Sequence, residues 1–381
     1  MWKGRLLIVA AAVIAYLPAL NNDFIADDWV ILHRVEVLKV DPLYLNESVP
    51  ENFRLTSYVV FALLKTAFGY HATPYYVFNI LLHALNCLML SAIVRTISGE
   101  DAVALLSGLM MAVFQAPQEA VMWLAAMNET LSAFFIFATF LLWFHGHRVP
   151  ATLTFAAALY SKESAVILIV LLPLVEWMRG RRASLTDYWI LAAPASVFVI
   201  LFLSTLSANF QVGQGTYALS FRGALVLLKS LHRLFWPWGY AIALAAIVAN
   251  RGKLSWRFPG WAALIPVTML PYIFVTYTNN IPSRQTYLAS AVFAPLLAAG
   301  ILSLHTKTWR AVMAAGFIAG NMIYMWTVKD SQMEARALPT TALAKVLHQF
   351  SPQDMRIRGF EYPVDLIVKG VAVSLPGWSW D

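Results

Sequence analysis

The sequence has 381 residues, of which 60% are hydrophobic and only 12% are charged. Soluble domains carry about twice that charged fraction, so the composition excludes a soluble globular protein and predicts an all-α, polytopic membrane protein. The net charge of +7 does not indicate nucleic-acid binding, because the basic residues occur in short clusters between apolar runs. The single cysteine, Cys87, lies inside an apolar run, which excludes a disulfide framework and a cysteine-based metal site.

Apolar runs predict about eleven membrane spans, since a span needs ~20 mostly apolar residues. The first is interpreted as an uncleaved span, because no small-residue cleavage site precedes the polar segment after it. The runs lie near residues 5–20, 75–97, 102–116, 128–145, 149–161, 164–178, 188–206, 235–250, 259–277, 286–304 and 309–328. We expect residues 1–330 to form a transmembrane module and residues 331–381 a short extracytoplasmic tail. In the tail, a helical stretch at 336–350 precedes "YPVDLIVKGVAV", which is either a strand or irregular.

Short basic loops after every second span predict the orientation. Lys3 and Arg5 precede the first span, and basic residues recur in "RGRR" (179–182) and "HTKTWR" (305–310). Positive charge marks the cytoplasmic side of a membrane. The N-terminus is therefore expected in the cytoplasm and the tail outside. The compact length of the chain and the absence of TPR repeats favour the bacterial inner membrane over the endoplasmic reticulum.

The unusual polar residues collect in the loops on the other side, above all in the first loop, residues 21–74. Within it, "DDWVILHRVEVLKV" has apolar residues at helical spacing, and "FRLTSYVVFALLKTAFGY" (53–70) is also helix-like. Both segments are too short or too polar to span a membrane. We therefore expect two helices that lie at the membrane surface.

Asp27 and Asp28 follow the first span by a few residues, and two interpretations are open. An acid before "WVILH" is a favourable helix N-cap, and the helix dipole favours a second acid beside it. Alternatively, the pair supplies a general base or a metal ligand at the mouth of an extracytoplasmic cavity. The two are compatible, because a capping position also fixes a side chain.

Three further loops on the outer side carry charged candidates. Lys162 and Glu163 in "LYSKESAV" are either a mutually satisfied pair at a helix break or a lysine that grips an anionic head group while the glutamate orients it. Arg284 in "IPSRQTYLAS" is either an interfacial snorkelling arginine or a fork for phosphate. Glu119 in "QAPQEAVMW" is either a solvated loop acid or a metal-binding or orienting residue.

Asn79, His83 and Asn86 follow an i, i+4, i+7 spacing on the second predicted span. They form one polar stripe on an otherwise apolar helix, so they are expected to face the protein interior or a cavity and not lipid. Hydrogen bonding between helices and the lining of a cavity are the two interpretations.

The order of these features resembles the C superfamily of membrane glycosyltransferases, GT-C. The resemblance is to the dolichyl- or polyprenyl-phosphate-mannose protein O-mannosyltransferases, including the transmembrane members that carry TPR repeats, although no TPR repeat occurs here. It covers about residues 1–330. Five segments carry it in order: "DFIADDW", "FRLTSYVVFALLKTAFGYHATPYYVFNILLH", "QAPQEAVMW", "LYSKESAV" and "IPSRQTYLAS".

This resemblance implies transfer of a sugar from a polyprenyl-phosphate donor to a hydroxyl acceptor on the extracytoplasmic face, with inversion at the anomeric carbon. Asp27 would be the general base, and Asp28 would support it or help to bind a divalent metal such as Mg²⁺ or Mn²⁺. Lys162 and Arg284 would neutralise the leaving phosphate. The acceptor would be a protein or an envelope glycan or lipid. A lipid-linked-sugar transporter or flippase is one alternative, and a non-catalytic membrane scaffold of the same fold is another.

Overall fold

The computed structural model describes residues 2–41, 54–181, 185–205, 210–249, 257–276, 279, 281–349 and 364–375. Every regular element among them is helical, and an isolated antiparallel bridge joins Tyr217 to Val275. The α-helices are α1 (Trp2–Tyr16), α2 (Asp27–Val40), α3 (Leu55–Phe68), α4 (Ala72–Ser98), α5 (Asp101–Val113), α6 (Glu119–Met122), α7 (Met127–Phe144), α8 (Arg148–Leu159), α9 (Leu168–Met178), α10 (Trp189–Ser204), α11 (Phe210–Gly213), α12 (Phe221–Phe235), α13 (Trp238–Ala249), α14 (Arg257–Met269), α15 (Tyr287–Leu302), α16 (Lys307–Tyr324), α17 (Asp330–Leu347) and α18 (Val364–Ala372).

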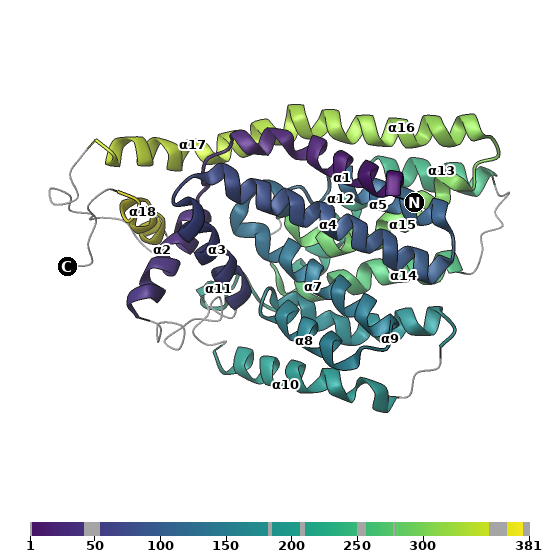
Figure 1. Ribbon diagram of the computed structural model, residues 1–381, viewed down its shortest axis with the longest axis horizontal. Helices are drawn as coiled ribbons and strands as arrows, with labels where there is room; N and C mark the ends of the chain where they lie inside the picture. The colour runs from purple at the N-terminus through teal and green to yellow at the C-terminus, as the bar shows by residue number, and fades with distance from the viewer. Residues whose placement is uncertain are drawn as a thin grey trace.

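Short 3₁₀ and π segments join several of these helices. The 3₁₀ segments used below are η4 (Leu124–Ala126), η5 (Glu163–Ile167), η8 (Leu270–Phe274) and η9 (Ser283–Thr286). A π segment, η10 (Met325–Lys329), joins α16 to α17 without a turn. The two helices therefore run as one long rod along an edge of the molecule, beside α1 (Figure 1).

Six described helical stretches are long and apolar enough to cross a membrane, and the pair α12 and α13, bent by 66°, would make a seventh. The predicted number of about eleven is not confirmed. The reason lies in helix length, because several apolar runs form helices of only 11 to 13 residues. A helix that short rises ~16–20 Å, less than the apolar thickness of a bilayer. The runs concerned are α5, α8 and α9.

A single apolar core joins the long helices. α4 packs between α1, α5 and α7, and α15 packs on α5 and α14. The polar stripe of α4 faces this core: Asn79, His83 and Asn86 are each fully buried. Small side chains on α15, such as Ala294 and Ala298, are also fully buried and allow helices to approach closely. The core therefore gives a rigid base from which the loops at one end of the molecule project.

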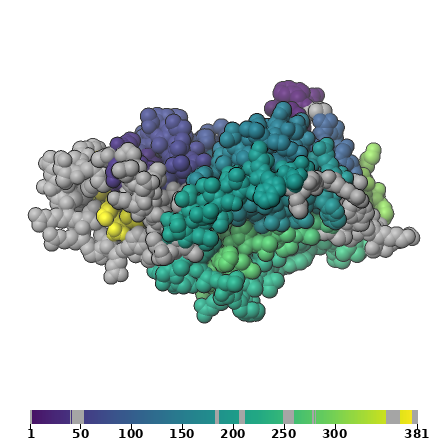
Figure 2. All heavy atoms as spheres, turned by 90° about the horizontal axis from the view of Figure 1, so that it is seen from below, coloured from purple at the N-terminus to yellow at the C-terminus, as the bar shows by residue number. Residues whose placement is uncertain are grey.

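The first loop forms two helices, as predicted, and both lie at one end of the molecule with α18 (Figure 1). In Figure 2 the yellow residues of α18 lie at the same end as the dark-blue residues of the first loop. The described part of "YPVDLIVKGVAV" is helix α18, so the expectation of a strand or irregular chain is wrong. Lys369 and Asp365 pair at 3.1 Å across one helical turn, and Val371 is buried. Residues 336–347 of the predicted helix at 336–350 are confirmed as part of α17, and residue 350 lies outside the described residues.

Candidate active site

A cavity of about 590 Å³ opens where α2 meets the ends of several other elements. Its apolar wall includes Phe198, Val199 and Phe202 of α10, one of the helices that could cross a membrane. Its charged wall comes from α2, the start of α3, α7, η5 and η9, and consists of Asp27, Arg34, Arg54, Glu129, Lys162, Glu163 and Arg284. The cavity thus combines a charged region with an apolar wall formed by a membrane-type helix.

Asp27 opens α2 and is exposed into this cavity. No hydrogen bond or ion pair of its carboxylate to another described side chain is found. The preceding residue, Ala26, has φ = +43°, a conformation that costs a non-glycine residue energy and that the surrounding structure must hold. Burial raises the pKa of Asp27 above its ordinary value, while the charges of Arg284, Arg336, Arg54 and Arg34 lower it. Asp27 is therefore an acid in a recess that is surrounded by arginines and has no bonded partner among the described side chains.

Asp28, the adjacent acid, is fully buried and does not line the cavity. Its Oδ2 accepts the N–H of Ile25 at 2.7 Å, and its Oδ1 accepts the N–H of Ala125 at 2.5 Å. Both oxygens of Asp28 therefore join the start of α2 to η4, which fits the predicted role of supporting Asp27. The metal-binding role of Asp28 stays a prediction. Burial raises the pKa of Asp28, and these two backbone hydrogen bonds oppose the rise.

Lys162 and Glu163 both line the cavity, but they belong to a larger network than the predicted pair. Lys162 Nζ lies 3.0 Å from Glu163 Oε1 and 3.7 Å from Glu129 Oε1. Arg54 donates to both oxygens of Glu163, at 3.1 and 3.4 Å. Burial and Arg54 lower the pKa of Lys162, and the two glutamates oppose that change. Burial alone would raise the pKa of Glu163, but Arg54 and Lys162 outweigh it and hold that pKa below its usual range.

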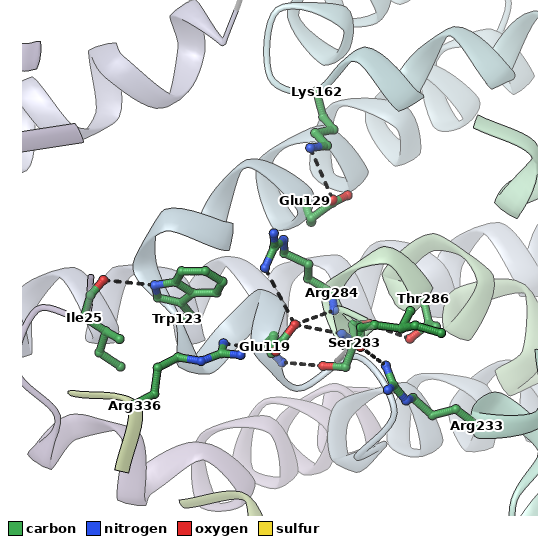
Figure 3. A network of polar contacts seen from close by, with 11 residues as sticks. Ile25, Glu119, Trp123, Glu129, Lys162, Arg233, Ser283, Arg284, Thr286 and Arg336 are labelled. Carbon is green, nitrogen blue, oxygen red and sulfur yellow. Dashed lines mark hydrogen bonds and ion pairs between the residues drawn. The ribbon is translucent and has the colours of Figure 1, made fainter. Parts of the chain in front are cut away.

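Arg284 also lines the cavity. Among the cavity cations whose ion pairs are described, it is the most loosely held (Figure 3). Its Nη1 lies 3.8 Å from Glu119 Oε2, and its guanidinium lies over the Trp123 ring, 4.7 Å from the centroid. Lys162, in contrast, is held between two carboxylates. Arg284 is therefore the better placed of the two predicted phosphate-binding residues.

Glu119 is buried and does not line the cavity. Its Oε2 accepts the backbone N–H groups of Ser283 and Arg284 at 2.7 and 3.3 Å, and its Oε1 accepts from Arg336 at 3.1 Å (Figure 3). It therefore orients the segment that carries Arg284, which is the predicted orienting role. No group of three or more His, Cys, Asp or Glu side chains that could hold a metal ion occurs in the part of the chain that the structure describes. The oxygens of Asp28 and Glu119 all accept N–H groups, which accounts for both acids without a metal. Their metal-binding role stays a prediction.

The polar stripe of α4 joins helices and does not line the cavity, which corrects the cavity interpretation. Asn79 donates to the carbonyls of Ala120 and Val121, at 2.9 and 3.0 Å. His83 Nδ1 and Asn86 Nδ2 both contact the Tyr287 hydroxyl, at 2.7 and 3.1 Å. Hydrogen bonding between helices is the interpretation that the structure supports.

Four residues of the site were not among the predicted candidates: Arg34, Arg54, Glu129 and Arg336. Arg34 lies two turns after Asp27 on the predicted surface helix, a spacing that places both on one face. Glu129 is an acid within a predicted span, which is itself a signal for function. Arg336 had no signal, because it lies in the polar tail among other charged residues.

No protein-family model and no curated relative matches the sequence. Structural similarity is found with the crystal structure of ArnT from Cupriavidus metallidurans bound to undecaprenyl phosphate. The superposition has a TM-score of 0.51 at 15% sequence identity, and it covers 97% of this chain and 75% of that chain.

This chain has the overall fold of that ArnT structure. The fold predicted from the order of sequence motifs is thereby confirmed. Within this fold the charged cavity is built mainly from the first loop, η5 and η9. These elements contain the acidic pair and the "SKE" and "SRQTYL" segments, which carried the sequence resemblance.

Proposed function

We propose that this protein is an inverting glycosyltransferase that moves a sugar from a polyprenyl-phosphate donor to a hydroxyl acceptor on the extracytoplasmic face of the membrane. The observation that carries the proposal is the Asp27 carboxylate, which faces a cavity lined by several cations and has no partner among the described side chains. Such a carboxylate can accept a proton, and such cations can hold a phosphate. The similarity to ArnT, which was crystallised with undecaprenyl phosphate, supports a donor of that class.

In this mechanism the donor phosphate lies against Arg284, with Lys162 nearby, and the polyprenyl chain lies along the apolar wall formed by α10. The acceptor oxygen attacks the anomeric carbon, the carbon–oxygen bond to the phosphate breaks, and Asp27 takes the hydroxyl proton. The bonding electrons leave with the phosphate, whose charge the two cations stabilise. One displacement inverts the anomeric centre. An acid catalyst is not required, because the phosphate is already a good leaving group.

Asp27 must be ionised to act as a base, and this requirement gives a pH dependence. Its pKa is raised above the ordinary value of 3.8. Activity is therefore expected to fall as the pH decreases through this raised pKa, at a higher pH than for an exposed aspartate. The acceptor class, whether protein or envelope glycan or lipid, and the bacterial inner membrane location are part of the proposal.

The test uses purified protein in nanodiscs with a mixed pool of polyprenyl-phosphate sugars and measures the release of free polyprenyl phosphate. We expect Asp27→Asn to reduce the rate by about 10²–10⁴-fold, the usual contribution of a general base. Asp23→Asn is the matched control, since Asp23 lies on the same connection but does not line the cavity. Turnover that survives Asp27→Asn unchanged would contradict the proposal. In sealed proteoliposomes, wild-type movement of intact donor across the bilayer without phosphate release would instead favour a flippase.

A further inference from the structure

Helix α17 lies in the tail of the chain and contacts two segments that border the proposed site. Arg336 donates to Glu119 Oε1 at 3.1 Å, and its guanidinium lies over the Trp123 ring, 4.8 Å from the centroid. One turn later, Thr340 Oγ1 lies 3.4 Å from the Ala26 N–H and 3.4 Å from the Phe24 carbonyl. Residues i and i+4 of a helix share a face. One face of α17 therefore contacts the turn that carries Asp27 and the segment that carries Trp123.

The two partners of Arg336, Glu119 and Trp123, each make a further hydrogen bond (Figure 3). These bonds lead to the segment that carries Arg284 and to the turn that precedes Asp27. Glu119 Oε2 accepts the backbone N–H groups of Ser283 and Arg284. On the other side, Trp123 donates its indole N–H to the Ile25 carbonyl at 3.1 Å, two residues before Asp27. Arg336 is thus the shared partner of two chains of contacts, one ending at the phosphate-binding arginine and one at the base.

We propose that Arg336 is a positioning residue for the sugar transfer, which fixes Arg284 and Asp27 relative to each other through Glu119 and Trp123. The proposal rests on the function proposed above. A displacement of about 1 Å between catalytic groups reduces a rate by about 10²-fold. The planar guanidinium suits this role, because it bonds a carboxylate and packs on an aromatic ring at once.

The charge of Arg336 also acts on Asp27. Among the cations around Asp27, Arg284 lowers its pKa most, followed by Arg336, Arg54 and Arg34. These groups come from η9, α17, the start of α3 and α2, while Glu129, Lys162 and Glu163 line the same cavity. If the charge at position 336 is removed, the ionised form of Asp27 loses stabilisation. The pKa of Asp27 then rises, and a larger fraction of the base is protonated at a given pH.

The experiment measures polyprenyl phosphate release from pH 4 to 8 for wild type, Arg336→Gln and Arg336→Lys in nanodiscs. For Arg336→Gln we expect the acid limb of kcat to move upward by roughly 0.5–1 pH unit and the plateau rate to fall about 10-fold or more. Arg336→Lys keeps the charge but not the planar fork. It should therefore restore the acid limb while leaving the plateau reduced.

Lys345→Gln is the matched control, because Lys345 is an exposed cation of the same helix that does not line the cavity. It should leave both the limb and the plateau unchanged. An Arg336→Gln profile with an unmoved acid limb and a normal plateau would overturn the inference, and so would a limb that Arg336→Lys does not restore. Failure of wild type to release phosphate would refute the proposed function. In that case, Asp carboxyl titration by ¹³C NMR, with Asp27→Asn to assign the signal, still tests the effect of Arg336 on Asp27.

Discussion

Asp27 and Asp28 are adjacent and chemically identical, but they have different surroundings because successive residues of a helix point about 100° apart. Asp27 faces the cavity, whereas Asp28 faces the protein and accepts two backbone N–H groups. The sequence predicted that this acidic pair is special and offered a helix cap and a catalytic base as alternatives. The structure assigns one role to each residue: Asp28 secures the start of α2, and Asp27 is the candidate base.

This division predicts different effects of two conservative substitutions. Asp28→Asn leaves one buried N–H facing an amide NH₂ group, and a buried unsatisfied donor costs about 1–3 kcal/mol. We expect a clearly lower thermal unfolding midpoint for Asp28→Asn, followed by intrinsic fluorescence in detergent. Asp27→Asn should keep the wild-type midpoint, because the raised pKa of Asp27 means that its charge does not stabilise the fold. Equal midpoints for the two variants would contradict the assignment.

At the scale of elements, α18 and α2 approach each other closely beside the site. A Cβ atom at Gly370 would overlap the carbonyl of Trp29, which lies one turn into α2. Backbone cannot move aside as a flexible side chain can, so only glycine permits this packing. Tyr70 also donates its hydroxyl to the Val373 carbonyl at 3.2 Å, just after α18. The helix that carries Asp27 is therefore held from the outside by a segment from the tail.

Gly370→Ala should consequently push α18 away from α2. We expect faster hydrogen–deuterium exchange in the peptide covering residues 27–40, since α2 loses its packing partner. Gly213→Ala serves as the control, because nothing lies within 4 Å of the added methyl group. Unchanged exchange in α2 would mean that the two helices separate without consequence for the site.

The tail also marks the limit of prediction from this sequence. The surface helices of the first loop were predictable because apolar residues recur at helical spacing in a polar context. Segment 364–372 reads equally well as alternating strand or amphipathic helix, and only its packing on α2 decides between them. Arg336 has no local signal at all, since its partners lie more than 200 residues away. Long-range pairing of this kind is a property of the fold and not of the local pattern.

At the scale of the whole molecule, the orientation in the membrane still rests on the distribution of basic loops. The chain is convenient for testing it, because Cys87 is fully buried and should not react with thiol reagents. Asp23→Cys and His147→Cys place exposed thiols on the two predicted sides. In sealed right-side-out vesicles, we expect an impermeant maleimide to label Asp23→Cys at once and His147→Cys only after permeabilisation. The reverse pattern would invert the topology.

The contact between the first and last long helices has a consequence for biogenesis. Trp326 donates its indole N–H to the Ile14 and Ala15 carbonyls, each at 3.1 Å, so the rod formed by α16 and α17 is bound to α1. A ribosome makes Asp27 early, but Thr340, Arg336 and Gly370 emerge only some 300 residues later. Asp27 is therefore synthesised long before the residues of α17 and α18 that pack around it. The surroundings of Asp27 can be completed only after those later residues have been made.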